Sequence, residues 1–431
     1  MKKKESVIVL TLGCAKNVVD SEKLIARLIS NGIDVTFDLN KADTCIINTC
    51  GFIKPSVEEN LGVLLEVINR KIQKKLKRVI VFGCLVERFK ENLIKEFPEV
   101  DYFIGVENQE LILKYLNENI ELKENLIGER YLLTPRHFAY LKISEGCNRE
   151  CSFCTIPIIR GKLKSKPIKD LVEEVKYLES IGVKELVIIS QDTSSYGIDL
   201  YSKSMLIDLL RELVQVSGIH WIRLMYLYPA GLPNNLIDFV ANENKICNYF
   251  DIPIQHISDT VLKSMRRGTS KKNIIELIEK IRRKIPNSAI RTTLIVGYPN
   301  ETEKDFLELI KFLEDYELDR VGVFTYSAED GTSSFLLGDP IPEDEKLRRR
   351  DAIFELQRNI SLKKNRELVG KNIKVIIDEV NNGIMLGRTE FDAPEVDNLV
   401  HVKVKGRKYE PGDFVDVKVV KSKTYDIFAE I

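Results

Sequence analysis

Three cysteines stand within the nine residues GCNRECSFC, at Cys147, Cys151 and Cys154. Thiolates at such spacing hold zinc or iron–sulfur clusters. A structural zinc site normally takes four protein ligands, and no second Cys or His pair follows this group. His137 precedes the strand leading into the group, so we expect it at the far end as a surface or packing residue. An iron–sulfur cluster on three cysteines keeps one iron free for another molecule, and the spacing therefore favours a reactive cluster.

A second set of three cysteines has the same property at longer range. Cys14 follows VIVLTLG, Cys50 follows CIINT and Cys84 follows RVIVFG, and each of these runs is typical of a buried strand. The carboxyl ends of parallel strands meet at one edge of a sheet, so these three thiols are predicted to converge. Cys45, inside its strand, and Cys247 are left over, and we expect both in the core.

The elements that position these residues divide into three parts. The first 120 or so residues alternate apolar runs with helical patterns, which indicates an α/β unit with a mostly parallel sheet. After a polar connector at 117–137, six strand-then-helix repeats predict a partial (β/α)6 barrel with its site at the strand carboxyl ends. A charged helix ending at Gly370 leads to short strands with turns at NNG and PGD, a pattern typical of a small antiparallel β-barrel. The fold class is α/β, with domains at 1–121, 133–365 and 366–431.

Composition excludes several classes of protein. Lys+Arg and Asp+Glu both total 65, so no overall field attracts nucleic acid or an anionic membrane. No apolar run approaches the roughly 18 residues that a membrane helix needs. The start, MKKKESVIVLTLGC, imitates a secretion signal, but Glu5 interrupts it and AKNVVDSEKLIARLI continues as an amphipathic helix. We therefore expect a cytoplasmic protein, in which cysteines are ligands or core residues rather than disulfides.

The Cys-x3-Cys-x2-Cys group, with Phe153 before its last cysteine and a partial barrel behind it, resembles the radical S-adenosylmethionine (SAM) enzymes. The resemblance implies a 4Fe–4S cluster on Cys147, Cys151 and Cys154 whose free iron binds the amino and carboxylate groups of SAM. Cleavage then yields methionine and a deoxyadenosyl radical. A preceding three-cysteine domain and a terminal domain similar to TRAM extend the resemblance to the methylthiotransferases over nearly the whole chain. This implies a second 4Fe–4S cluster on Cys14, Cys50 and Cys84, implicated in sulfur delivery.

The same resemblance suggests which polar groups contact SAM. Gln191 and Asp192 resemble the position that meets its amino group, and Gln255 and Arg291 are candidates for its ribose and carboxylate. LIVGYPNETEKDF looks like the adenine-side stretch, in which Gly297 permits close approach. Each has an equally weighted structural alternative as a barrel residue satisfied by neighbouring backbone, and Phe153 either stacks or packs. Catalytic residues beyond the cluster ligands are not identified.

Several stretches look like the branch of the family that modifies a protein, an aspartate β-carbon in small-subunit ribosomal protein twelve: LGCAKNVVDSE, AYLKISEGCNRECSFCTIPIIRG, QDTSSYGIDLY, YFDIPIQH and GRTEFDAPEVD. Such an enzyme needs an electron donor, such as flavodoxin or ferredoxin, and a sulfur source, but no membrane or nucleic acid. The alternatives are a transfer-RNA adenosine methylthiotransferase, a radical enzyme of another kind, and a non-enzymatic iron–sulfur electron carrier.

Charge tests this choice of substrate independently. Residues 366–431 hold 11 Lys and Arg against 12 Asp and Glu, whereas a domain that grips transfer RNA is expected to have a basic face. We expect the acidic segment EFDAPEVD, with Glu390, Asp392, Glu395 and Asp397, to dock a basic ribosomal protein. The alternative is a solvated loop.

Overall fold

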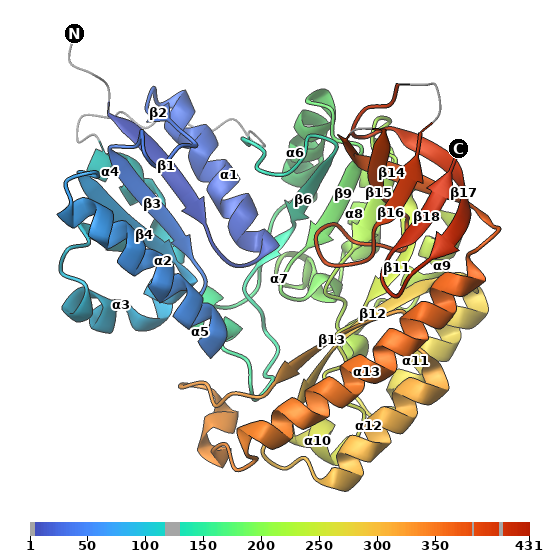
Figure 1. Ribbon diagram of the computed structural model, residues 1–431. Helices are drawn as coiled ribbons and strands as arrows, with labels where there is room; N and C mark the ends of the chain where they lie inside the picture. Colours follow the sequence, from blue (N-terminus) through green and yellow to red (C-terminus); the bar gives the residue numbers. More distant parts are fainter. Residues whose placement is uncertain (1–4, 117–129, 382, 405–407) are drawn as a thin grey trace. The chain divides into compact units, whose positions relative to one another are not determined.

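The computed structural model describes residues 5–116, 130–381, 383–404 and 408–431 (Figure 1). It divides into two compact units. The first comprises residues 1–133, 145–148 and 155–164, and the second comprises 134–144, 149–154 and 165–431. Among the described residues, no helix has the length and apolarity needed to cross a membrane. The polar connector predicted at 117–137 lies largely outside the described residues, as does the boundary at 121.

The first unit is built on a parallel five-stranded sheet in the order β2-β1-β3-β4-β5. Leu24, Ile25 and Leu28 of α1 pack on one face together with α4, while α2 and α3 cover the other face. This sandwich confirms the predicted α/β unit, although the short strands β2 and β5 were not anticipated. The elements are β1 Ser6–Thr11, α1 Ala15–Ser30, β2 Asp34–Val35, β3 Thr44–Thr49, α2 Lys54–Ile72, β4 Arg78–Gly83, α3 Cys84–Glu96, β5 Tyr102–Ile104, η1 Val106–Asn108, α4 Glu110–Leu116 and α5 Ile156–Arg160.

The second unit contains a parallel six-stranded sheet in the order β13-β12-β11-β10-β9-β6, as the six repeats predict. The strands follow one another in chain order across the sheet, so every strand carboxyl end faces the same way. Its elements are β6 Phe138–Lys142, α6 Ile168–Ser180, β9 Glu185–Ile189, η2 Thr193–Ser195, α7 Ile198–Tyr201, α8 Leu206–Leu213, β10 Trp221–Leu224, η3 Pro229–Gly231, α9 Leu236–Asn242, β11 Ile246–Asp251, α10 Asp259–Ser264, α11 Lys271–Lys284, β12 Ala289–Val296, α12 Glu303–Tyr316, β13 Arg320–Thr325 and η4 Ser333–Leu337; short strands β7 Ser144–Glu145 and β8 Lys164–Ser165 flank α5 in the chain.

The long helix α13, Glu343–Glu367, connects this sheet to a closed five-stranded barrel, as Figure 1 shows. Ten buried residues from its strands form a separate core. The order is β14-β15-β16-β18-β17, antiparallel except for the parallel pair β16 and β18, which the sequence did not predict. The strands are β14 Asn372–Asn381, β15 Ile384–Arg388, β16 Val400–Lys403, β17 Phe414–Ser422 and β18 Ile427–Glu430.

Candidate iron–sulfur and cofactor sites

The three cysteines of the first unit lie at the carboxyl ends of adjacent strands. Cys14 is the N-cap of α1 after β1, Cys50 follows β3 directly, and Cys84 is the first residue of α3 after β4. Because β1, β3 and β4 are neighbours, their ends share one edge of the sheet.

Two glycines show how closely these loops approach one another. A Cβ on Gly13, at φ +95°, would lie 2.5 Å from Cys50 Cβ. A Cβ on Gly51 would lie 2.7 Å from the Cα of Leu85, next to Cys84. Carbon atoms do not pack at such distances, so both positions exclude a side chain. The three cysteine loops therefore converge, as the sequence predicted.

Burial changes the pKa of two of these thiols. It raises the pKa of Cys50, and it raises that of Cys84 to about 11. The guanidinium of Arg160 opposes this by favouring the thiolate at both sulfurs. A metal ligand must be deprotonated, so burial alone disfavours binding and a nearby positive charge assists it.

Asn17 ties the loops together beneath the cysteines. Its amide nitrogen donates to the carbonyl oxygens of Leu12, at 2.7 Å, and Thr49, at 3.2 Å. Asn48 donates in turn to the carbonyl oxygen of Asn17. These bonds join the segments after β1 and β3 and fix the positions of Cys14 and Cys50. Nothing in the sequence singles out Asn17 beyond its place three residues after Cys14.

The donor set has the chemistry of an iron–sulfur cluster. All three candidate ligands are free cysteines on converging loops. In a 4Fe–4S cluster held by cysteines, each thiolate binds one iron. Three converging thiols therefore fit such a cluster and leave one iron without a protein ligand.

The GCNRECSFC segment follows β6 and the two-residue strand β7, after the carboxyl end of the first strand of the six-stranded sheet. Arg267 Nη1 donates to Cys151 Sγ at 3.2 Å, and the Tyr228 hydroxyl lies 4.0 Å from the same sulfur. The guanidinium groups of Arg149 and Arg267 lie 4.1 and 4.3 Å from the Tyr228 ring centroid. All three cysteines of the segment are partly accessible, as an exchangeable ligand position requires.

Among the residues predicted to contact SAM, Phe153 lies within the cysteine loop, and three others follow strand carboxyl ends. Phe153 packs against the cluster of Val261, Met265, Tyr298 and Tyr326, which supports its packing role. Gln191 and Asp192 come just after β9. The Asp192 carboxylate accepts hydrogen bonds from the side chains of Arg149 and Ser195 and from the backbone of Ser194. Gly297 follows β12 at φ +75°, and the atom that a Cβ would meet, at 2.4 Å, is Cγ of Lys346 on α13.

Gln255 is the strongest of these candidates. It is not a glycine, yet its φ is +72°, a left-handed conformation that β-carbons disfavour. Its Oε1 is buried and has no hydrogen-bond partner among the described residues. A buried acceptor without a donor costs free energy, and a hydroxyl of a bound cofactor would remove that cost. Gln255 therefore fits a ribose contact.

Arg291 does not lie with the other residues predicted to contact SAM. It is the third residue of β12, and Gly297, just past the end of that strand, is six residues farther, about 20 Å at the rise of a strand. Its guanidinium pairs with Asp251 at 3.1 Å and with Asp397 at 3.5 Å. Both carboxylates belong to this chain.

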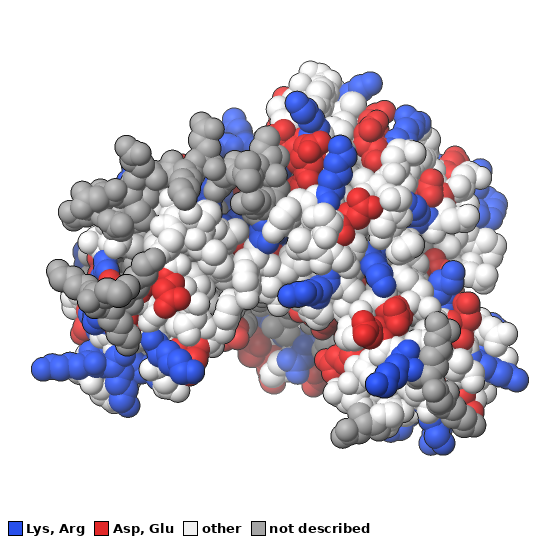
Figure 2. Space-filling model, turned by 90° about the horizontal axis from the view of Figure 1, so that it is seen from above, with Lys and Arg blue, Asp and Glu red and all other residues white. Residues whose placement is uncertain are grey.

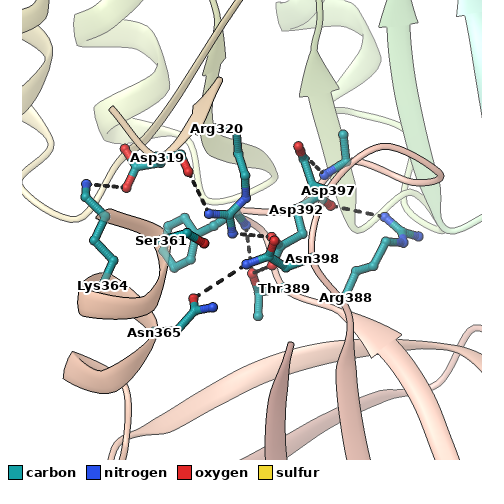
Figure 3. A network of polar contacts seen from close by, with 12 residues as sticks. Asp319, Arg320, Ser361, Lys364, Asn365, Arg388, Thr389, Asp392, Asp397 and Asn398 are labelled. Atoms are coloured by element: carbon teal, nitrogen blue, oxygen red, sulfur yellow. Dashed lines mark hydrogen bonds and ion pairs between the residues drawn. The ribbon is translucent and has the colours of Figure 1, made fainter. Parts of the chain in front are cut away.

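The acidic segment is where the structure corrects the sequence. We expected EFDAPEVD to be a docking surface, but Asp392 is 3% exposed and the Asp397 side chain 2% exposed. Arg320 pairs with Asp392, Tyr249 donates to Asp397 and Tyr140 donates to Glu395, while Asn248 donates its backbone N–H to Glu390. Figure 3 shows Arg320 and Asp392 pointing toward each other at the centre of this network. The segment therefore packs on strands of the six-stranded sheet, which supply the arginines, tyrosines and backbone N–H that bind its carboxylates.

The remaining cysteines and His137 behave as predicted. Cys45 and Cys247 are at most 1% exposed, within the two cores. His137 is buried and its Nε2 lies 2.7 Å from Asp378 Oδ1.

Comparison with known proteins defines the class. Residues 141–313 match the radical SAM superfamily, 6–105 the uncharacterized protein family UPF0004 and 369–431 the TRAM domain. The solved structure of the radical SAM methyltransferase TsrM from Kitasatospora setae, with cobalamin and a 4Fe–4S cluster bound, has a TM-score of 0.56 at 13% identity and covers 75% of each chain. That of OxsB, a cobalamin-dependent SAM radical enzyme, has a TM-score of 0.52 at 12% identity over 80% of this chain and 56% of the other. The chain has the radical SAM fold.

Full-length relatives narrow the class to one family. The ribosomal protein uS12 methylthiotransferase RimO of Aquifex aeolicus is 50% identical over 97% of this chain and 95% of its own. The proteins of the same name from Flavobacterium johnsoniae and Chloroherpeton thalassium are 46% and 45% identical, over at least 98% of each chain. The chain belongs to the RimO family.

The site includes two residues that the sequence reasoning missed. Arg160 and Arg267 each donate a hydrogen bond to the sulfur of a predicted cluster ligand. One signal was available for Arg160, because it is the single charge in the stretch TIPIIRG.

Proposed function

We propose that the protein is a radical SAM methylthiotransferase that replaces a hydrogen on the β-carbon of an aspartate in ribosomal protein uS12 with a methylthio group. The observation that carries the proposal is the second set of converging cysteines, Cys14, Cys50 and Cys84, in a chain of the RimO family. Cleavage of SAM alone needs one cluster, whereas insertion of sulfur needs a second site to hold it.

In this proposal the two cysteine sets have separate tasks. Cys147, Cys151 and Cys154 hold the cluster that binds SAM, and Cys14, Cys50 and Cys84 hold the one from which sulfur is delivered. When bound, the first supplies the electron that cleaves SAM, and the chemistry of that cofactor removes a hydrogen too weakly acidic for any side-chain base. The protein itself binds and orients the reactants, and it excludes competing reactions.

The chain's own residues give the cofactor pocket its shape. We assign the ribose to Gln255, because its buried amide oxygen faces no other donor in the described chain. We assign Gln191, after β9, as a further polar contact, and Asp192 acts by holding Arg149 through a 2.7 Å hydrogen bond. Phe153 and Gly297 shape the walls. Arg291 we assign to the Asp251 and Asp397 carboxylates.

The proposal also covers the domains, the location and the partners of the protein. The three domains are 1–121, 133–365 and 366–431, and the protein works in the cytoplasm, where ribosomal proteins are made. It needs a one-electron donor of low potential, such as flavodoxin or ferredoxin, and a sulfur source.

Replacement of each cysteine set by alanine separates the two tasks. Cys147, Cys151 and Cys154 variants should abolish deoxyadenosine formation, while Cys14, Cys50 and Cys84 variants should retain part of it and lose methylthiolation of uS12. Cys45→Ala and Cys247→Ala are matched controls that remove buried thiols without touching either set. Deoxyadenosine is measured by chromatography and uS12 by mass spectrometry under anaerobic conditions. If folded variants of both sets lose both products, the division of tasks is wrong.

A further inference from the structure

Arg160 makes a contact that the proposed function does not explain. Its Nε and Nη2 lie 3.2 and 3.1 Å from Cys84 Sγ, both within the first unit. Its side chain is 2% exposed, so these are buried, charge-assisted hydrogen bonds to the sulfur of a predicted cluster ligand. Arginine presents several N–H donors in one plane, which allows two of them to reach the same sulfur.

The surroundings of Arg160 hold it in this position. Asp20 of α1 accepts from Nη1 at 2.9 Å, Glu145 accepts from the same nitrogen at 3.1 Å, and Asn17 Oδ1 accepts from Nη2 at 2.8 Å. Burial by itself lowers the pKa of the guanidinium, but the charges of Asp20, Cys84 and Glu145 raise it well above its usual value. The group is a permanent positive charge in a site of low dielectric.

The place of Arg160 in the chain is also informative. It ends α5, six residues after Cys154, and its partner Glu145 stands two residues before Cys147. The segment that carries one cysteine set therefore also supplies the charged group beside a sulfur of the other set. A simple structural ion pair would need Asp20 or Glu145, but it would not need two donors aimed at Cys84.

We propose that Arg160 is a positioning residue that sets the reduction potential of the cluster on Cys14, Cys50 and Cys84, an inference that rests on the proposed function. Reduction adds one electron from a low-potential donor and one negative charge to the cluster and its thiolates, and no bond forms or breaks. Hydrogen bonds to the sulfurs and nearby charge are what tune such potentials. Positive charge at Cys84 stabilises the reduced form and raises the potential.

The test is a redox titration of the reconstituted full-length protein, followed by electron paramagnetic resonance. Arg160→Gln should shift the reduction potential of this cluster by about 59 mV to more negative values. For one electron, this shift corresponds to about a tenfold change in the ratio of reduced to oxidised cluster. Arg160→Lys keeps the charge with a single donor group and should shift it less. Arg130→Gln is the matched control, because Arg130 is buried in the same unit and paired with Glu22 of α1, and it should leave the potential unchanged.

A background with Cys147, Cys151 and Cys154 replaced by alanine isolates the signal of interest. An unchanged potential in folded, iron-loaded Arg160→Gln overturns the inference. If that variant does not hold its cluster, Arg160→Lys decides: a negative shift supports the inference, and no shift or a positive one overturns it. Wild-type protein that binds only about four irons, instead of about eight in two clusters, overturns the proposed function itself, and the inference with it.

Discussion

Accessibility of the thiols differs between the two cysteine sets. Two of the three thiols in the first set are buried, with Cys50 7% and Cys84 6% exposed, and only Cys14 is partly accessible, whereas Cys147, Cys151 and Cys154 are all partly accessible. An iron without a protein ligand is open to oxidants and chelators, and accessibility of its surroundings sets how fast they reach it. We therefore expect the two clusters to lose iron at different rates.

Exposure to air with a chelator should remove iron first from the cluster on Cys147, Cys151 and Cys154. Deoxyadenosine formation should disappear before the spectroscopic signal of the second cluster does. Proteins carrying only one cysteine set, followed by absorption and iron content, provide the measurement. Full activity after such treatment would refute the assignment of clusters to these cysteines.

A buried histidine makes stability depend on pH. His256 is fully buried, its Nδ1 accepts from the backbone N–H of Ser258 at 3.0 Å, and burial lowers its pKa to about 4. The unfolded chain takes up this proton at a higher pH than the folded one. The contribution is therefore complete above about pH 6.5 and is lost as the pH falls toward 4, by about 3 kcal/mol in total.

His256→Asn keeps an acceptor near the Ser258 N–H and removes the titrating group. Its free energy of unfolding should change less between pH 6.5 and 4 than that of the wild type, as measured by denaturant unfolding at a series of pH values. His220→Asn, at an exposed histidine, is the control. Parallel curves for wild type and His256→Asn would contradict the prediction.

The segment between β15 and β16 connects the terminal barrel to the radical SAM sheet through buried polar contacts. Arg223 donates to the backbone carbonyl oxygens of Glu390 and Thr389, and Arg320 pairs with Asp392. On the other side, Asn398 reaches Asn365 of α13 (Figure 3). These buried charges lose water on folding, so removing one partner leaves the other uncompensated.

Asp392→Ala should therefore lower the free energy of unfolding by about 3–5 kcal/mol. Asp315→Ala breaks the exposed pair with Lys311 and should cost less than about 1 kcal/mol. Thermal or denaturant unfolding of the two variants measures the difference. Equal effects would mean that the Arg320–Asp392 pair is not the structural link described.

Sequence patterns predicted the elements but not all of their interactions. Apolar runs followed by Gly-Cys identified β1, β4 and two of the converging thiols, because buried strands are recognisable from local pattern and the carboxyl ends of parallel strands share one edge. The burial of Asp392 and Asp397 could not be predicted in this way, because their partners Arg320 and Arg291 are distant in the chain. A surface acidic loop and a buried one have the same composition. Arg160 was missed for the same reason, because its function depends on Cys84, which is 76 residues away.

At the scale of the whole molecule, charge is balanced and dispersed. Lys+Arg equals Asp+Glu, and on the face seen in Figure 2 the two signs are interspersed. Neutralisation of phosphates supplies most nonspecific affinity for nucleic acid, and no excess of positive charge is available for it. The molecule is therefore suited to a protein substrate, in agreement with its membership of the RimO family.

The most direct measurement is a single anaerobic competition assay. The reconstituted protein receives SAM, a reductant, a sulfide source, ribosomal protein uS12 and bulk transfer RNA together, and both products are analysed by mass spectrometry. We predict that one aspartate of uS12 gains a methylthio group in place of a hydrogen and that transfer-RNA adenosine remains unmodified. Methylthiolated adenosine with unmodified uS12 would contradict it.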